Sequence, residues 1–161
     1  MGSLQFLNKE AKNIMVMITE FRHTGVVVSD MEGALFFYRD LLGLKVTKDF
    51  IEESDHINEI LSLSGIRLRI VKVSIGSTTI LELFHFLKPE MNSVIPPIWN
   101  IGCSHIAFTV KNINKVYEEL LNHGVHFNCP PCLSPDGSVM YTYCKDPDGT
   151  NIELVQGISK S

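Results

Sequence analysis

An apolar strand pattern that carries one histidine occurs twice in the chain, and this duplication constrains the fold more than any other feature. The first copy covers residues 21–28 (FRHTGVVV) and the second covers residues 102–110 (GCSHIAFTV). Because strand side chains alternate between two faces, His23 and His105 each point away from the apolar face of their strand. The two histidines therefore hold equivalent positions in two copies of one unit.

An amphipathic helix is predicted directly after each of these strands, over residues 30–42 and 112–123. Each begins at a side chain suited to capping, Ser29 or Asp30 in the first copy and Asn112 in the second, and each ends before a glycine. That glycine follows the histidine by 20 residues in the first copy and by 19 in the second. The pattern indicates a duplicated strand-helix unit.

Three further strands are predicted in each unit. In the first unit they cover residues 44–50, 66–75 and 78–87, with a short helical segment within 51–65, and in the second unit they cover 125–127, 139–145 and 150–156. The turn Asp-Pro-Asp-Gly at 146–149 closes the last hairpin. We therefore predict an α+β fold of two β-α-β-β-β modules.

The predicted boundaries follow from this order. The first module covers residues 19–88 and the second covers 101–157, with a proline-containing linker at 89–100. Residues 1–18 precede the repeat, and their apolar run 14–18 reads as a leading strand or the end of a short helix. The two modules together form one domain.

Composition excludes several classes of function. A chain of 161 residues with 45% hydrophobic content is long enough to bury one good core. Its net charge of −4 argues against a nucleic-acid surface, which needs a basic patch. No apolar stretch is long enough to span a membrane, and the start lacks the layout of a secretion signal, so we expect a soluble, cytoplasmic protein.

The last strand of each module places one carboxylate, Glu82 or Glu153, among apolar residues. A charged group in a half-buried strand costs free energy unless it is paired or bound to a metal. Each histidine and glutamate alone could be an ordinary core or surface residue, but four groups in matched places favour one common cause. Together with His23 and His105, the glutamates suit one divalent ion: zinc, nickel, cobalt, manganese or iron(II).

The two histidine strands, the segment 81–83 (LEL) and the segment 146–154 (DPDGTNIEL) together resemble the vicinal oxygen chelate superfamily over residues 20–157. This superfamily includes glyoxalase I, methylmalonyl-CoA epimerase, extradiol dioxygenases, and fosfomycin and bleomycin resistance proteins. The resemblance implies that the curved mixed sheets of the two modules form a cup around one metal. It also implies that four residues bind this metal: His23, Glu82, His105 and Glu153.

The implied activity is that of a metal-dependent lyase or isomerase, similar to glyoxalase I or methylmalonyl-CoA epimerase, which moves a proton next to a carbonyl through a metal-stabilised enolate or enediolate. Glu153 is the first candidate for the base and Glu82 the second. The alternatives are an extradiol-type dioxygenase, which generally uses three ligands and would leave Glu82 without a role, and a non-catalytic drug-resistance binding protein. Val27 and Phe86 stand where glyoxalase I has residues that hold glutathione, which leaves the substrate open.

Two arginines on a strand next to Glu82 are candidates for binding the substrate. Arg67 and Arg69 alternate on one face, where they could clamp a substrate carboxylate or phosphate, or could simply line a solvated sheet edge. The expected partners are a small-molecule substrate and a second copy of the chain, because each module leaves sheet edges to cover. Members of the family close the cup either within one chain or across a dimer.

Overall fold

The computed structural model describes residues 18–90 and 97–158. The elements of the first module are β1 (Thr24–Val27), α1 (Met31–Leu35), the π-helix η1 (Phe36–Leu41), β2 (Lys45–Glu52), α2 (Asp55–Leu61), β3 (Arg67–Ile75) and β4 (Thr78–Lys88). The elements of the second module are β5 (Ile106–Thr109), α3 (Ile113–Asn122), β6 (Cys132–Leu133), β7 (Val139–Lys145) and β8 (Asn151–Gly157).

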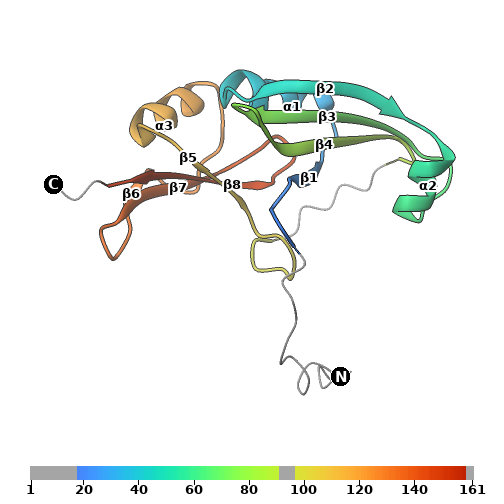
Figure 1. The fold of residues 1–161 in the computed structure, drawn as a ribbon. Helices are drawn as coiled ribbons and strands as arrows, with labels where there is room; N and C mark the ends of the chain where they lie inside the picture. The colour runs from blue at the N-terminus through green and yellow to red at the C-terminus, as the bar shows by residue number, and fades with distance from the viewer. Residues whose placement is uncertain (1–17, 91–96, 159–161) are drawn as a thin grey trace, which may run out of the picture.

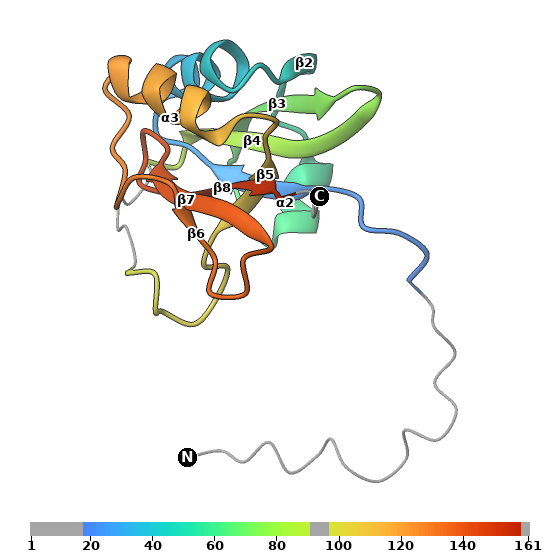
Figure 2. The ribbon, with the colours of Figure 1, turned by 90° about the vertical axis from the view of Figure 1, so that its left-hand side faces the viewer.

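Each module forms a four-stranded mixed sheet, and the two sheets have the same topology. Their strand orders are β1-β4-β3-β2 and β5-β8-β7-β6. The first strand of each module runs parallel to the last, and the other neighbours are antiparallel. In both views α1 and α3 lie on one side of the sheets, whereas α2 lies on the other side of the first sheet (Figures 1 and 2). The predicted α+β class with curved sheets is confirmed.

The predicted caps of the two long helices are present in the structure. The side chain of Asp30 accepts hydrogen bonds from two backbone N–H groups of the first turn of α1, and Asn112 accepts one at the start of α3. Gly43 and Gly124 follow the helices with φ of 75° and 80°, a conformation that glycine adopts without steric cost. The first helix is not a continuous α-helix, because it widens into a π-helix at Phe36.

The structure differs from the predicted strands in two places. Both histidines lie just before their strands, because pairing with the last strand begins at Thr24 and at Ile106. The predicted strand at 125–127 makes a single bridge, and the edge strand β6 lies at 132–133 instead. Two prolines without an N–H precede β6 and limit its extent. The segment 14–18, predicted as a leading strand or the end of a short helix, lies outside the described residues, apart from Ile18.

One hydrophobic core joins the two modules beneath the helices. Leu81 and Leu83 of β4 are buried in the same cluster as Ile152 and Leu154 of β8, as the alternation of each strand predicts. A smaller cluster lies on the other face of the first sheet; its members are Ile66, Leu68 and Ile70, with Leu61, Phe84 and Phe86 packed against them. No helix in the described ranges is long and apolar enough to cross a membrane.

A buried polar contact also joins the modules. The hydroxyl of Tyr38, in the first module, donates a 2.8 Å hydrogen bond to Asp146 Oδ2 in the last turn of the second module. From the same turn, Asp148 accepts a 2.9 Å hydrogen bond from the backbone N–H of Ser29. The turn at 146–149 therefore holds the first helix against the second module, in addition to closing a hairpin.

Alkylation of the native protein is expected to modify three of its four cysteines. All four are free thiols, and Cys103, Cys129 and Cys132 are exposed whereas Cys144 is buried. Burial, together with the negative charge of Asp146, raises the pKa of the Cys144 thiol to about 12, so little reactive thiolate forms at pH 8. Mass spectrometry after iodoacetamide treatment should show three adducts without denaturant and four with it. Equal reactivity of Cys144 in the native protein would contradict the packing of β7 against the core.

Candidate functional site

The first pair of predicted metal residues lies where β1 runs beside β4. Gly25 is the register partner of Glu82, so His23, two residues earlier, lies on the same face of the sheet as the carboxylate. His23 Nε2 is 3.5 Å from Glu82 Oε2, and Glu82 is only 7% exposed. A Cβ atom added at Gly25 would meet no atom within 4 Å, so the space beside Glu82 at Gly25 is open.

The second pair repeats this geometry where β5 runs beside β8. Ala107 is the register partner of Glu153, and His105 lies two residues before Ala107. His105 Nε2 is 3.3 Å from Glu153 Oε2. We call His23 with Glu82 the first half-site, and His105 with Glu153 the second half-site.

The half-sites have the chemistry and spacing of two ligands of one metal ion. Ligand atoms that each lie about 2.1 Å from an ion are about 3.0–3.4 Å from one another in tetrahedral or octahedral geometry. Of the two separations between imidazole nitrogen and carboxylate oxygen, the 3.3 Å of the second half-site lies within this range and the 3.5 Å of the first lies just above it. The donors themselves, imidazole and carboxylate, suit borderline divalent ions.

The structure does not bring the two half-sites together within one chain. Among residues 18–90 and 97–158, no group of three or more histidine, cysteine, aspartate or glutamate side chains is placed to hold one metal ion. Each chain therefore presents two separate pairs, rather than the single four-residue cluster of the sequence prediction.

Two residues that the sequence reasoning missed flank the glutamates. Lys72 on β3 is the register partner of Glu82, and its ammonium group forms an ion pair with Glu82 Oε1. Tyr143 on β7 is the register partner of Glu153, and its ring packs edge-on against His105 with centroids 5.4 Å apart. Burial, followed by the charge of Glu153, raises the pKa of Tyr143, so the phenol keeps its proton at neutral pH.

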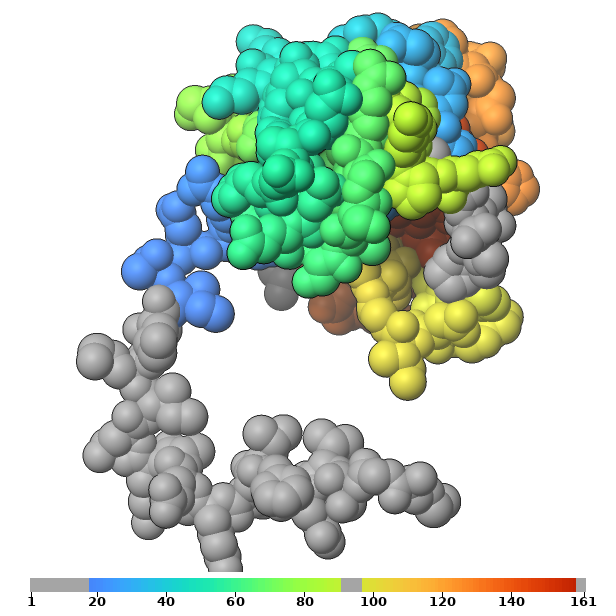
Figure 3. Space-filling model, turned by 90° about the vertical axis from the view of Figure 1, so that its right-hand side faces the viewer, coloured from blue at the N-terminus to red at the C-terminus, as the bar shows by residue number. Residues whose placement is uncertain are grey.

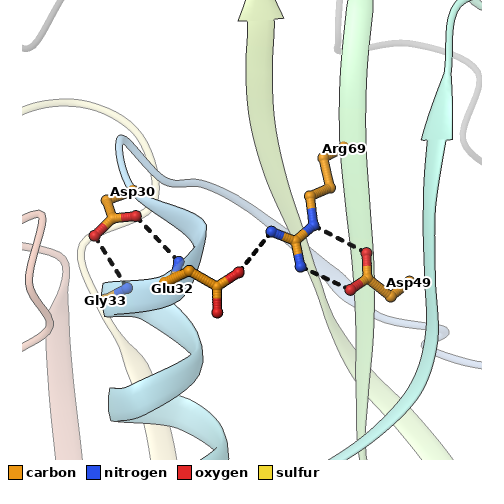
Figure 4. A network of polar contacts seen from close by, with 5 residues as sticks. All are labelled: Asp30, Glu32, Gly33, Asp49 and Arg69. Carbon is orange, nitrogen blue, oxygen red and sulfur yellow. Dashed lines mark hydrogen bonds and ion pairs between the residues drawn. The ribbon is translucent and has the colours of Figure 1, made fainter.

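The arginines proposed as a substrate clamp are placed elsewhere. Arg69 donates to both carboxylate oxygens of Asp49, at 3.0 and 2.7 Å, and to Glu32 of α1 at 2.8 Å (Figure 4). This network lies on the helix side of the first sheet, opposite to the face that carries Glu82. Arg67 pairs with Glu53 at 3.2 Å. The structure does not bring either arginine to a half-site.

A cavity of about 870 Å³ lies between the modules, beside β1 and the end of the turn at 146–149. Figure 3 shows the surface hollowed between the end of β4 and the yellow segment that begins at residue 97. His105 contributes to its lining, but His23, Glu82 and Glu153 do not. The cavity is thus an intermodule space and does not contain either complete half-site.

Comparison with known proteins agrees with this architecture. The family model described as "Glyoxalase/Bleomycin resistance protein/Dioxygenase superfamily" matches residues 20–154. The uncharacterised protein YwkD of Bacillus subtilis is 28% identical over 88% of this chain and 99% of its own length. A probable lactoylglutathione lyase of a Synechocystis strain is 25% identical over 86% of this chain and 95% of its own.

A solved protein structure has the same fold as this chain. The crystal structure of a glyoxalase family protein from Bacillus cereus superposes with a TM-score of 0.80, covers 94% of this chain and 100% of that protein, and is 20% identical in sequence. At this identity, the likeness shows the fold alone. From the family match over residues 20–154, the duplicated modules and the paired half-sites, we conclude that this chain belongs to the glyoxalase/bleomycin resistance protein/dioxygenase superfamily.

Proposed function

We propose that this protein is a divalent-metal-dependent lyase or isomerase that moves a proton next to a carbonyl group of a small molecule. The observation that carries the proposal is the pair of matched half-sites, each with an imidazole nitrogen within 3.5 Å of a carboxylate oxygen. Two unrelated, partly exposed histidines would not repeat this arrangement at the same position of both modules. The metal ligands under this proposal are His23, Glu82, His105 and Glu153.

A second copy of the chain is proposed to complete each site. Because the half-sites of one chain stay apart, the first half-site of one copy must meet the second half-site of the other to give four ligands. The exposed apolar residues Trp99 and Ile101, with Val27 on the edge strand β1, offer surface for such a contact. The proposed homodimer then has two equivalent sites.

The residues around the proposed site have different roles in the proposed proton transfer. A divalent ion, when bound, supplies a Lewis acid for the oxygen next to the carbon that loses its proton. Glu153 is the proposed base, because its carboxylate pairs with His105 and lies beside the neutral phenol of Tyr143, whereas Glu82 is also held by the cationic Lys72. The neutral phenol of Tyr143, beside Glu153, can donate a hydrogen bond toward a substrate oxygen.

Four ligands favour proton transfer over ring cleavage. Glu82 lies in the first half-site beside His23, where a dioxygenase that uses three ligands would not need it. The relative named as a probable lactoylglutathione lyase supports the same class. A binding protein without chemistry is the remaining alternative, and metal analysis separates it from the proposal.

Replacing Glu82 by glutamine is expected to weaken metal binding by at least about 100-fold, because an anionic ligand is lost from a four-ligand site. Wild-type protein reloaded with zinc, nickel, cobalt, manganese or iron(II) should hold about one ion per chain. Elemental analysis and competition with a chromophoric chelator measure both quantities. Glu53→Gln, which changes an exposed glutamate in the same module, is the matched control.

The activity itself is tested by proton exchange. Metal-loaded protein should exchange the α-proton of acyl-CoA or hemithioacetal candidates in heavy water, and Glu153→Gln should abolish this exchange while metal remains bound at saturating concentration. If no metal binds to the wild-type protein, the metalloenzyme proposal fails and the binding-protein alternative takes its place.

A further inference from the structure

The two half-sites are alike in their ligands but differ in the residues beside them. Across the first sheet, the register places Gly25, Glu82, Lys72 and Lys48 in one row, from β1 to β2. In the second sheet, the corresponding row runs from Ala107 through Glu153 to Tyr143. The first half-site therefore has two cationic side chains in its row, where the second has a neutral phenol.

The contact between Lys72 and Glu82 sets up a competition for the carboxylate. Oε2 of Glu82 faces His23, whereas Oε1 is bound by the ammonium group of Lys72. An incoming divalent ion must either displace this ammonium group or bind a few ångströms from it, and two cations at that separation repel each other even when partly screened. Lys72, whose side chain is 29% exposed, is therefore expected to weaken metal binding at Glu82.

The positive charge of Lys72 also affects which substrates the site can bind. One divalent ion and two carboxylates sum to a neutral site, so Lys72 makes the assembled site positive, and the exposed Lys48 extends this charge along the row. A lysine displaced from Glu82 keeps its three N–H donors, and a carboxylate or phosphate accepts from them with a charge-assisted hydrogen bond. Arg67 and Arg69 are paired with other carboxylates, Arg67 with Glu53 and Arg69 with Glu32 and Asp49, and not with Glu82.

We propose that Lys72 is a specificity-determining residue: it competes with the metal for Glu82 and, once the metal holds Glu82, it selects substrates that carry a negative charge beside their chelating oxygens. This inference rests on the proposed metal site. It names the substrate class that the site would accept, an anionic small molecule with a carboxylate or phosphate close to the reacting carbon.

The first arm of the test measures metal affinity. Lys72→Met is expected to bind cobalt(II) about tenfold more tightly than wild type, because it removes the competing cation but keeps the aliphatic stem. Lys72→Arg should restore wild-type affinity, since it keeps the charge. Lys115→Met, which removes a lysine from the exposed face of α3, is the charge-matched control and should change nothing. Competition with a chromophoric chelator and the visible spectrum of bound cobalt report the affinity without any assay of activity.

The second arm measures anion selection, with oxalate as a chelating dianion. Titration of the cobalt-loaded proteins should show oxalate binding about tenfold weaker to Lys72→Met than to wild type, with Lys72→Arg close to wild type. Tighter cobalt binding and weaker oxalate binding by Lys72→Met, found together, support the proposal.

The outcomes separate this proposal from the one on which it rests. Equal cobalt affinity in wild type and Lys72→Met overturns the competition, and equal oxalate affinity overturns the selection, while both leave the metal site itself intact. Failure of both proteins to bind cobalt overturns the metal site, and the role of Lys72 falls with it.

Discussion

Replacing Asp146 by alanine is expected to lower the free energy of unfolding by about 3–5 kcal/mol, one of the largest single-residue effects in the chain. Asp146 is 5% exposed, and its carboxylate accepts hydrogen bonds from the Tyr38 hydroxyl at 2.8 Å and from the backbone N–H groups of Asp148 and Thr150 at 3.0 and 2.7 Å. Alanine leaves these donors without a partner in a buried place. It also frees the turn that holds the first helix against the second module.

Chemical denaturation followed by circular dichroism measures this loss. Asp136→Ala is the matched control, because Asp136 accepts similar hydrogen bonds in another turn but is exposed. We expect the control to cost less than about 1 kcal/mol. A loss at Asp146 no larger than that at Asp136 would show that the contact between the modules contributes little to stability.

The protonation of Asp146 gives this contact a pH dependence of known sign. Burial raises the pKa of Asp146 above its ordinary value, although the Tyr38 hydroxyl and the turn N–H groups partly oppose the shift. A carboxyl group whose pKa is higher in the folded protein stabilises the fold below its ordinary pKa, and this stabilisation is lost as pH rises through the raised value. Asparagine does not titrate, so the stability of Asp146→Asn relative to wild type should increase from about pH 4 toward neutrality. Parallel denaturation curves at several pH values test the sign.

Much of the fold follows from periodicity that the sequence shows directly. Strand alternation correctly predicted that Leu81 and Leu83 face the core and that Glu82 faces away from it, and the same holds around Glu153. Alternation also put each histidine and each glutamate on the side of its strand away from the apolar residues, and in the structure one histidine lies beside one glutamate in each module. Alternation does not fix how two modules meet in space, so it could not show that the half-sites of one chain remain apart.

Lys72 and Tyr143, which flank the two glutamates, show how one β-bulge limits the prediction of strand pairing from sequence. The hairpin of β7 and β8 keeps one register along its whole ladder, so counting from the pair Lys145 and Asn151 at the turn puts Tyr143 opposite Glu153. The hairpin of β3 and β4 contains a bulge, since Ser74 pairs with Thr79 but Val73 pairs with Leu81. Regular pairing would have put Val71 opposite Glu82, and the one-residue shift puts Lys72 there instead. The sequence carried no signal for this shift.

The proposed dimeric site predicts the second large effect, which is complementation between two variants that are each expected to be inactive. One variant combines His23→Ala with Glu82→Gln and lacks the first half-site, and the other combines His105→Ala with Glu153→Gln and lacks the second. Each alone should lose tight metal binding and α-proton exchange, because every site in its dimer keeps only two ligands.

Coexpression of the two variants is expected to restore about a quarter of the wild-type metal content per chain, because about half of the dimers are mixed and one of the two sites in each mixed dimer has all four ligands. If both half-sites of one chain formed the same site, no combination of the two variants could restore it, so the recovered metal content decides between the two arrangements. Coexpressing two differently tagged copies of the first variant controls for expression and should restore nothing. A quarter of the metal with a matching share of proton exchange would establish that the half-sites, which are separate in each chain, meet across a homodimer.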